Sequence, residues 1–97
     1  MAFMRGLVTE QNYFRRLIGV KFLAREQEMD NVPALLYALG DPDLRICREA
    51  HDGLRLISRK LNSITVPDNA SQTDYESAKT KWTEWFLKIR PGAELLD

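Results

Sequence analysis

The stretch at residues 42–61 constrains the fold of this chain more than any other feature. At 100° per residue its apolar side chains fall within one arc of about 120°, as in a helix that packs one face on a core. They are Ile46, Cys47, Ala50, Gly53, Leu54, Ile57 and Leu61. The residues outside the arc are Arg45, Arg48, Glu49, Asp52, Arg55, Arg59 and Lys60. The pattern predicts a helix with one buried and one solvated face.

Three other segments carry helix signals, whereas strand signals are almost absent. We expect helices over about 10–28, 32–39, 42–61 and 74–90, with a polar loop at 62–73. The first segment is apolar over more than half of its circumference, so it is expected to pack against more than one neighbour. Its Gly19 costs about 1 kcal/mol relative to alanine, which a close helix–helix crossing would explain. The sequence predicts an all-α fold in a single domain spanning residues 1–97.

Two aspartates flank a proline in the sequence GDPDLR. They could form a carboxylate pair for metal binding or acid–base chemistry, but no further metal ligands stand nearby. We therefore expect a helix start, with Asp41 as the N-cap, Pro42 at the first helical position and Asp43 in the first turn. Thr73 and Glu76 have the T-x-x-E spacing of a capping box, which predicts a second helix start there.

Charge and composition exclude several classes of function. Lys and Arg number 14, as do Asp and Glu, so no bulk field attracts nucleic acid or an anionic membrane. No apolar run approaches the roughly 20 residues of a membrane span, and the start MAFMRGLVTEQ has no apolar signal-peptide core. The single cysteine excludes an internal disulfide and a cysteine-rich zinc site. We therefore expect a cytoplasmic protein.

The segment VPALLYALGDPDLRICREAHDGLRLI resembles a HEAT repeat of the bacterial type. Its short helix, its Asp-Pro-Asp turn and the apolar spacing of Ile46, Ala50 and Leu54 carry the resemblance. Residues 12–28 resemble the second helix of a preceding repeat, and 74–91 resemble the closing helix of such modules. Many HEAT repeats have an arginine that ties neighbouring repeats together where this chain has Cys47. The resemblance implies a short α-solenoid, whereas the cysteine departs from the pattern on which the usual ladder of inter-repeat Asp–Arg pairs depends.

Few residues could carry chemistry. Cys47 and His51 are one helical turn apart, but the cysteine belongs to the apolar arc, and a buried thiol is inert. Tyr75, Trp82 and Trp85 could stack on a ligand, yet they follow the apolar stripe of their helix and are expected to pack in the core. We assign no catalytic, metal-binding or cofactor-binding residue, and we do not expect an enzyme.

The first functional hypothesis is a non-catalytic protein-interaction or scaffold module. The helix at 10–28 has more apolar surface than so short a chain can bury, so we expect it to meet a second copy, another protein, or repeats that precede this segment in a longer polypeptide. Candidate partner-binding residues are Tyr13, Phe14, Arg15, Ile18, Phe22, Arg48, Arg55 and Arg59.

Two alternatives remain open. The basic face of 42–61 could contact nucleic acid phosphates, although Glu49 and Asp52 interrupt it, which favours a solvated face. The other alternative is an accessory subunit of a lyase, because HEAT-like repeats also occur in bilin lyase subunits. Only Cys47 and His51 could carry such chemistry.

Overall fold

A computed structural model describes residues 2–60 and 62–96 of the chain. Its described part is all-helical and contains no strand. The α-helices are α1 (Ala2–Gly6), α2 (Tyr13–Glu26), α3 (Val32–Ala38), α4 (Leu44–Ser58) and α5 (Gln72–Ile89), and the 3₁₀ helices are η1 (Leu7–Thr9) and η2 (Met29–Asn31). The all-α prediction is confirmed, but the count of four helices is wrong, because α1 forms before α2. Within the described residues, none of the helices combines the length and apolar character needed to cross a bilayer.

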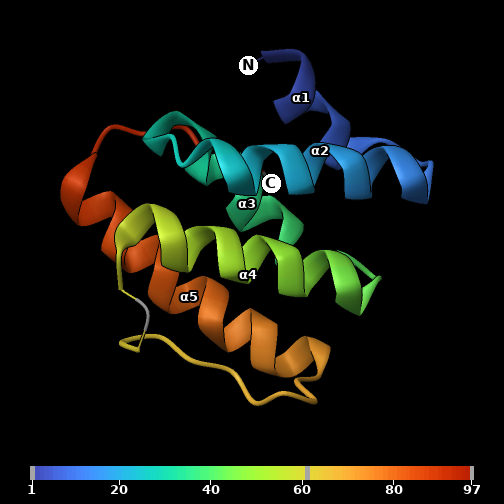
Figure 1. Cartoon of the computed structure of the whole chain (residues 1–97). Helices are drawn as coiled ribbons and strands as arrows, with labels where there is room; N and C mark the ends of the chain where they lie inside the picture. Colours follow the sequence, from blue (N-terminus) through green and yellow to red (C-terminus); the bar gives the residue numbers. More distant parts are fainter. Residues whose placement is uncertain (1, 61, 97) are drawn as a thin grey trace.

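The three long helices α2, α4 and α5 run in the same direction (Figure 1). Two contacts agree with this parallel arrangement, because they join residues at similar heights along neighbouring helices. Lys21 of α2 approaches Glu49 of α4, and His51 of α4 contacts Trp82 of α5. The segment between α4 and α5 returns the chain to the end where α4 began, so α5 starts beside the start of α4 (Figure 1). The short helix α3 contacts α2, α4 and α5.

A glycine brings α2 and α4 close together. A Cβ atom at Gly53 would lie 2.6 Å from Cβ of Ala24, so any side chain there would force the helices apart. The predicted close approach at Gly19 exists, but its partner differs from the expected one. A Cβ at Gly19 would lie 2.7 Å from Cβ of Leu7 and 3.1 Å from the carbonyl oxygen of Met4. Gly19 therefore accommodates the α1–η1 segment, which the sequence analysis did not foresee as structured.

The core lies between α2, α3, α4 and α5. Its largest fully buried side chains include Leu23, Leu35, Leu39, Ile46, Leu54, Tyr75, Trp82 and Phe86. Tyr75, Trp82 and Phe86 come from one face of α5, and α5 packs on α3 and α4. The helix at 74–90 thus covers the helices before it, as expected from its aromatic stripe.

The predicted helix starts are wrong by two residues at both places. Helix α4 begins at Leu44, and its N-cap is Asp43, whose side chain accepts a hydrogen bond from the backbone N of Arg45. Asp41 is not a cap, and Pro42 lies before the helix rather than at its first position. Asp41 instead accepts from the backbone N of Asp43 and faces α2.

At the second start, Ser71 caps α5 and forms a capping box with Asp74. Thr73 and Glu76, the residues expected to form it, lie inside the helix. Ser71 and Asp74 have the same i, i+3 spacing as Thr73 and Glu76, and helix α5 begins at the earlier pair. Leu61, counted in the apolar arc of 42–61, lies outside the described residues.

Candidate protein-interaction surface

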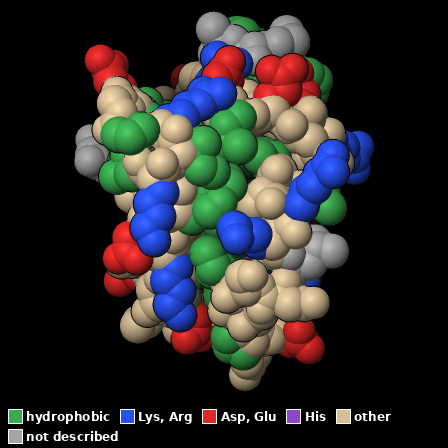
Figure 2. Space-filling model, turned by 90° about the vertical axis from the view of Figure 1, so that its left-hand side faces the viewer, with side chains coloured by type: hydrophobic (Ala, Val, Ile, Leu, Met, Phe, Trp, Pro, Cys, Tyr) green, Lys and Arg blue, Asp and Glu red, His purple; other side chains and the backbone are tan. Residues whose placement is uncertain are grey.

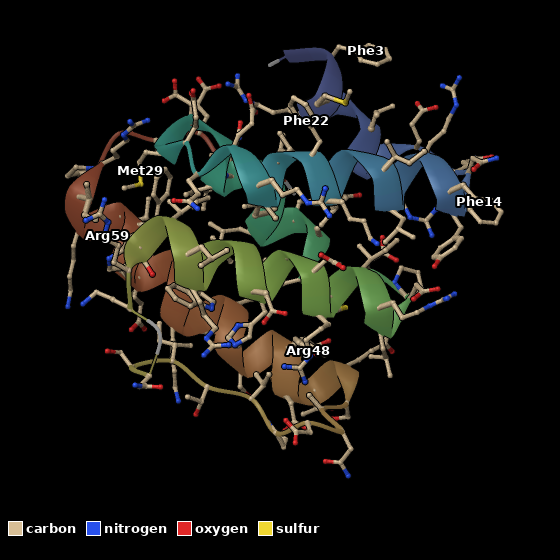
Figure 3. The ribbon with its side chains drawn as sticks, in the orientation of Figure 1. Phe3, Phe14, Phe22, Met29, Arg48 and Arg59 are labelled. Atoms are coloured by element: carbon tan, nitrogen blue, oxygen red, sulfur yellow. The ribbon has the colours of Figure 1, made fainter. Side chains whose placement is uncertain are left out.

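An apolar stripe runs along the outer face of α2. Phe14, Ile18 and Phe22 are spaced four residues apart, so they lie above one another on one side of the helix. Phe14 is 70% exposed and Ile18 is 57% exposed, while Phe22 is half-buried. Phe14 lies at the beginning of α2, and Phe22 points away from α4 on the side where α1 lies (Figure 3). We call these three residues the α2 stripe.

The α2 stripe has two different borders. On one side the α1–η1 segment approaches α2 at Gly19, and Phe3 of α1 is 69% exposed. On the other side are the exposed cations Lys21 and Arg25, at the same four-residue spacing. A shallow hollow of about 460 Å³ lies over this region, lined by Ile18, Lys21, Phe22, Arg25 and Glu26. The hollow is lined by α2 alone, and Phe14 lies outside it, so the α2 stripe is an exposed apolar surface with a basic border.

The cations beside the α2 stripe form few and weak ion pairs within the chain. The Nζ atom of Lys21 is 3.8 Å from a carboxylate oxygen of Glu49, and both side chains are substantially exposed. For Arg25, the described residues provide no hydrogen bond or ion pair. Near the beginning of α2, Arg15 pairs with Glu10 at 3.2 Å. Exposed pairs of this kind contribute about 0–1 kcal/mol, so Lys21 and Arg15 can exchange them for a partner's carboxylates at little cost.

Tyr13 does not belong to the exposed stripe. Its ring stacks edge-on against Phe14 at a centroid distance of 5.2 Å, and the guanidinium of Arg45 lies 5.1 Å from the ring centroid. The hydroxyl oxygen is buried and lacks a hydrogen-bond partner among the described residues. Tyr13 therefore takes part in joining α2 to the beginning of α4 rather than lying open to a partner.

The three candidate arginines in and after α4 have different local environments. Arg48 donates to the carbonyl oxygens of Pro67 and Asp68 at 2.8 and 3.2 Å, and so ties the loop before α5 to α4 (Figure 3). Arg55 lies 3.6 Å from Asp52. Arg59 ends α4 in the left-handed conformation, with a φ of 59°. Arg48 is consequently committed to holding the loop in place.

A second apolar area lies on the side where α2, α4 and α5 end. Figure 2 shows a column of hydrophobic side chains on this side, with Lys and Arg side chains beside it. Met29 and Arg59 lie on this side of the molecule (Figure 3). Ile89, the last residue of α5, is 50% exposed. Basic residues near helix C-termini also complement the helix dipoles, so their presence here has a structural explanation.

Cys47 and His51 face different partners inside the core. The Cys47 thiol donates to the carbonyl oxygens of Leu39 and Asp41 at 3.3 and 3.1 Å, and burial raises its pKa to about 11. The Nε1–H of Trp82 donates to Nδ1 of His51 at 3.1 Å, and burial lowers the pKa of the imidazole to about 4. At neutral pH the thiol is protonated and the imidazole is neutral. Within residues 2–60 and 62–96, no three His, Cys, Asp or Glu side chains group as metal ligands would.

The sequence analysis missed Phe3, Lys21 and Arg25 as parts of this surface. Lys21 and Arg25 could have been found, because on a helical wheel of 10–28 they fall beside Ile18. Phe3 could not, because a five-residue helix carries no periodic signal, and α1 forms only against α2.

Comparisons with known proteins identify no relative of the chain. No protein-family model matches its sequence, no curated protein matches it, and no solved structure matches its fold. The surface described above therefore has to be interpreted from its own geometry and chemistry.

Proposed function

We propose that this protein is a non-catalytic protein-interaction module of HEAT-repeat type, and that the α2 stripe is its partner-binding surface. The observation that carries the proposal is the exposure of Phe14 and Ile18 on one face of a helix that otherwise packs into the core. Contiguous exposed apolar surface with polar borders is typical of protein interaction sites. Aromatic residues and arginine are also enriched at such sites.

The arrangement of helices supports the HEAT-type part of this proposal. A short helix, a tight turn and a long helix follow one another in α3 and α4, and the preceding long helix α2 runs parallel to α4 (Figure 1). An Arg–Asp pair joins α2 to the turn before α4, at 2.8 Å between Arg16 and Asp41. Repeat architectures bind partners on surfaces built from such stacked helices.

The test is a selection of displayed random peptides on the full chain, with two single variants for comparison. Ile18→Asp places a charge in the α2 stripe, and Ile89→Asp places one at a similarly exposed position at the end of α5. We expect selected peptides to bind the wild type and the Ile89→Asp variant, and to lose at least about tenfold in affinity for Ile18→Asp.

Each other outcome would count against the proposal. Peptides that bind Ile18→Asp normally but fail on Ile89→Asp would move the binding surface to the end of α5. A failure to select any peptide would contradict the proposed function, provided that circular dichroism shows the same fold for all three proteins.

A further inference from the structure

The length of the α2 stripe matches about two turns of a partner helix. From Phe14 to Phe22 the stripe spans eight residues at 1.5 Å per residue, about 12 Å, or slightly more than two helical turns. Its apolar side chains recur at the i, i+4, i+8 positions, so they form one ridge along α2 against which the apolar face of a second amphipathic helix can pack. The α1–η1 segment already packs on α2 at Gly19, on one side of the stripe, so a partner segment that lies along α2 avoids it.

The charges beside the α2 stripe discriminate between possible partners. Lys21 and Arg25 are exposed on the open side, and Arg25 has no ion pair among the described residues. The nearest carboxylate lining the hollow is that of Glu26, which accepts a hydrogen bond from Nδ2 of Asn31 at 3.0 Å. Within the part of the chain that the structure describes, Lys21 has only the exposed pair with Glu49 at 3.8 Å, and Arg25 has no acidic counterpart.

A second copy of the chain paired antiparallel along α2 is a poor occupant. An antiparallel twofold pairing of two α2 stripes uses the same patch on both copies. It would place Lys21 and Arg25 of both copies along the same edge of the interface, four cations together. Like charges brought together at an interface repel one another and disfavour the pairing.

We infer that the partner is a different protein, which contributes an amphipathic helix whose apolar face is bordered by carboxylates. Its apolar side chains lie on Phe14, Ile18 and Phe22, and its Asp or Glu side chains lie against Lys21 and Arg25. The inference rests on the proposed function, because it specifies what the same surface binds. The carboxylates determine orientation and association rate, while the apolar contacts provide most of the affinity.

Three helix-favouring peptides of about 15 residues test this inference on the full chain. They share one apolar i, i+4, i+8 stripe and differ only at the flanking positions, which are Glu, Gln or Lys. Binding is measured by fluorescence anisotropy at ~50 mM and ~500 mM salt, because screening separates charge from apolar contact. We expect the Glu peptide to bind at least about fivefold more tightly than the Gln peptide at low salt, and the Lys peptide to bind most weakly.

Variants of the chain separate the inference from the proposed function. Lys21→Gln with Arg25→Gln should abolish the preference for the Glu peptide and leave the affinity of the Gln peptide within about twofold, whereas Ile18→Asp should weaken all three peptides. Equal binding of the Glu and Gln peptides would overturn the acidic partner and leave the proposed function standing. Failure of all three peptides would overturn the helical partner. If sedimentation equilibrium shows a concentration-dependent dimer that Ile18→Asp abolishes, the inference of a different partner protein is overturned in favour of a second copy.

Discussion

The Nε–H of Arg16 donates a hydrogen bond to Oδ2 of Asp41 across 2.8 Å, and so joins α2 to the turn that precedes α4. The Asp41 side chain is almost fully buried, and its Oδ1 accepts from the backbone N of Asp43. Arg16 also donates to the carbonyl oxygens of Glu10 and Gln11. The Arg16–Asp41 pair therefore joins α2, the segment before it and the turn before α4, although the sequence pattern favoured a role for Asp41 as a helix cap.

A double-mutant cycle should detect this pair. Arg16→Gln and Asp41→Asn should each lower the free energy of unfolding by about 2 kcal/mol, because each leaves a largely buried charge without its partner. The double variant should lose at least about 1 kcal/mol less than the sum, as expected for residues in direct contact. Urea denaturation monitored by tryptophan fluorescence measures all four proteins. Simple additivity would contradict a direct interaction.

The start of α5 offers a comparison between two candidate caps. Ser71→Ala should lower the free energy of unfolding by about 1 kcal/mol, because the Ser71 side chain accepts from the backbone N of Asp74. Thr73→Ala serves as the matched control and should change it by less than about 0.5 kcal/mol, since Thr73 is exposed within the helix. Thermal unfolding is a sufficient measurement. A larger effect at Thr73 than at Ser71 would place the capping box two residues later.

The α2–α4 crossing should not tolerate a methyl group on α4. Gly53→Ala should lower the free energy of unfolding by about 1–3 kcal/mol, because the new Cβ would meet Cα and Cβ of Ala24 at 2.9 and 2.6 Å. Gly6→Ala should be neutral or stabilise by up to about 1 kcal/mol, because a Cβ there meets nothing within 4 Å.

The double variant Ala24→Gly, Gly53→Ala exchanges the two side chains across the same crossing. It should therefore be more stable than Gly53→Ala alone. If chemical denaturation shows Gly53→Ala to be as stable as the wild type, the helices do not cross this closely.

The buried imidazole should make stability depend on pH. The folded-state pKa of His51 is lowered to about 4 by burial, from 6.5, with Arg55 and Arg48 opposing and Asp52 favouring its protonation. Because the unfolded chain binds the proton first, the contribution of neutral His51 is fully present above about pH 6.5. This stabilisation is lost as the pH falls from 6.5 to 4, and the total loss of unfolding free energy is on the order of 3 kcal/mol.

The variant His51→Gln isolates this contribution, since the amide oxygen can still accept from Trp82. The difference in unfolding free energy between wild type and variant should shrink as the pH falls through this window. Urea titrations at several pH values measure it. A difference that stays constant from pH 7 to pH 4 would mean that His51 is protonated equally in both states.

The thiol of Cys47 should react only when the chain opens. It is fully buried, it donates to two carbonyl oxygens, and burial raises its pKa to about 11, so little thiolate is present at pH 8. Modification by a chromogenic disulfide reagent should be at least about 100-fold slower in the native chain than in concentrated urea. Rapid modification without denaturant would contradict the packing and revive a reactive-cysteine function.

The period of the apolar residues was sufficient to predict where most helices lie. Ile46, Ala50 and Leu54 identified the helix now seen as α4. Tyr75 and Trp82 of α5 were correctly placed inside the core, but Trp85, which was also expected there, is only partly buried. The helix starts were less predictable, because Asp41 and Asp43 are equally good caps by residue type. The choice depends on Arg16, which lies 25 residues earlier and captures Asp41.

The candidate surface was predictable in part. The helix at 10–28 was expected to have more apolar surface than the chain could bury, and its residues Phe14 and Ile18 are indeed exposed. Tyr13, Arg48 and Arg55 belonged to the same prediction, yet each has a partner within the chain: Arg45 for Tyr13, the loop carbonyls for Arg48 and Asp52 for Arg55. Periodicity identifies which residues share a helix face, but not which neighbour covers that face.

By itself the sequence determined that this chain is helical and which face of α4 and α5 is buried, because these properties follow from side chains a few residues apart on one helix. Only the tertiary structure decided that α1 covers Gly19, that Asp41 binds Arg16, and that the stripe of Phe14, Ile18 and Phe22 stays open beside Lys21 and Arg25. These features depend on contacts between segments distant in the chain. Such contacts are selected by the packing of the whole molecule, and no local pattern records them.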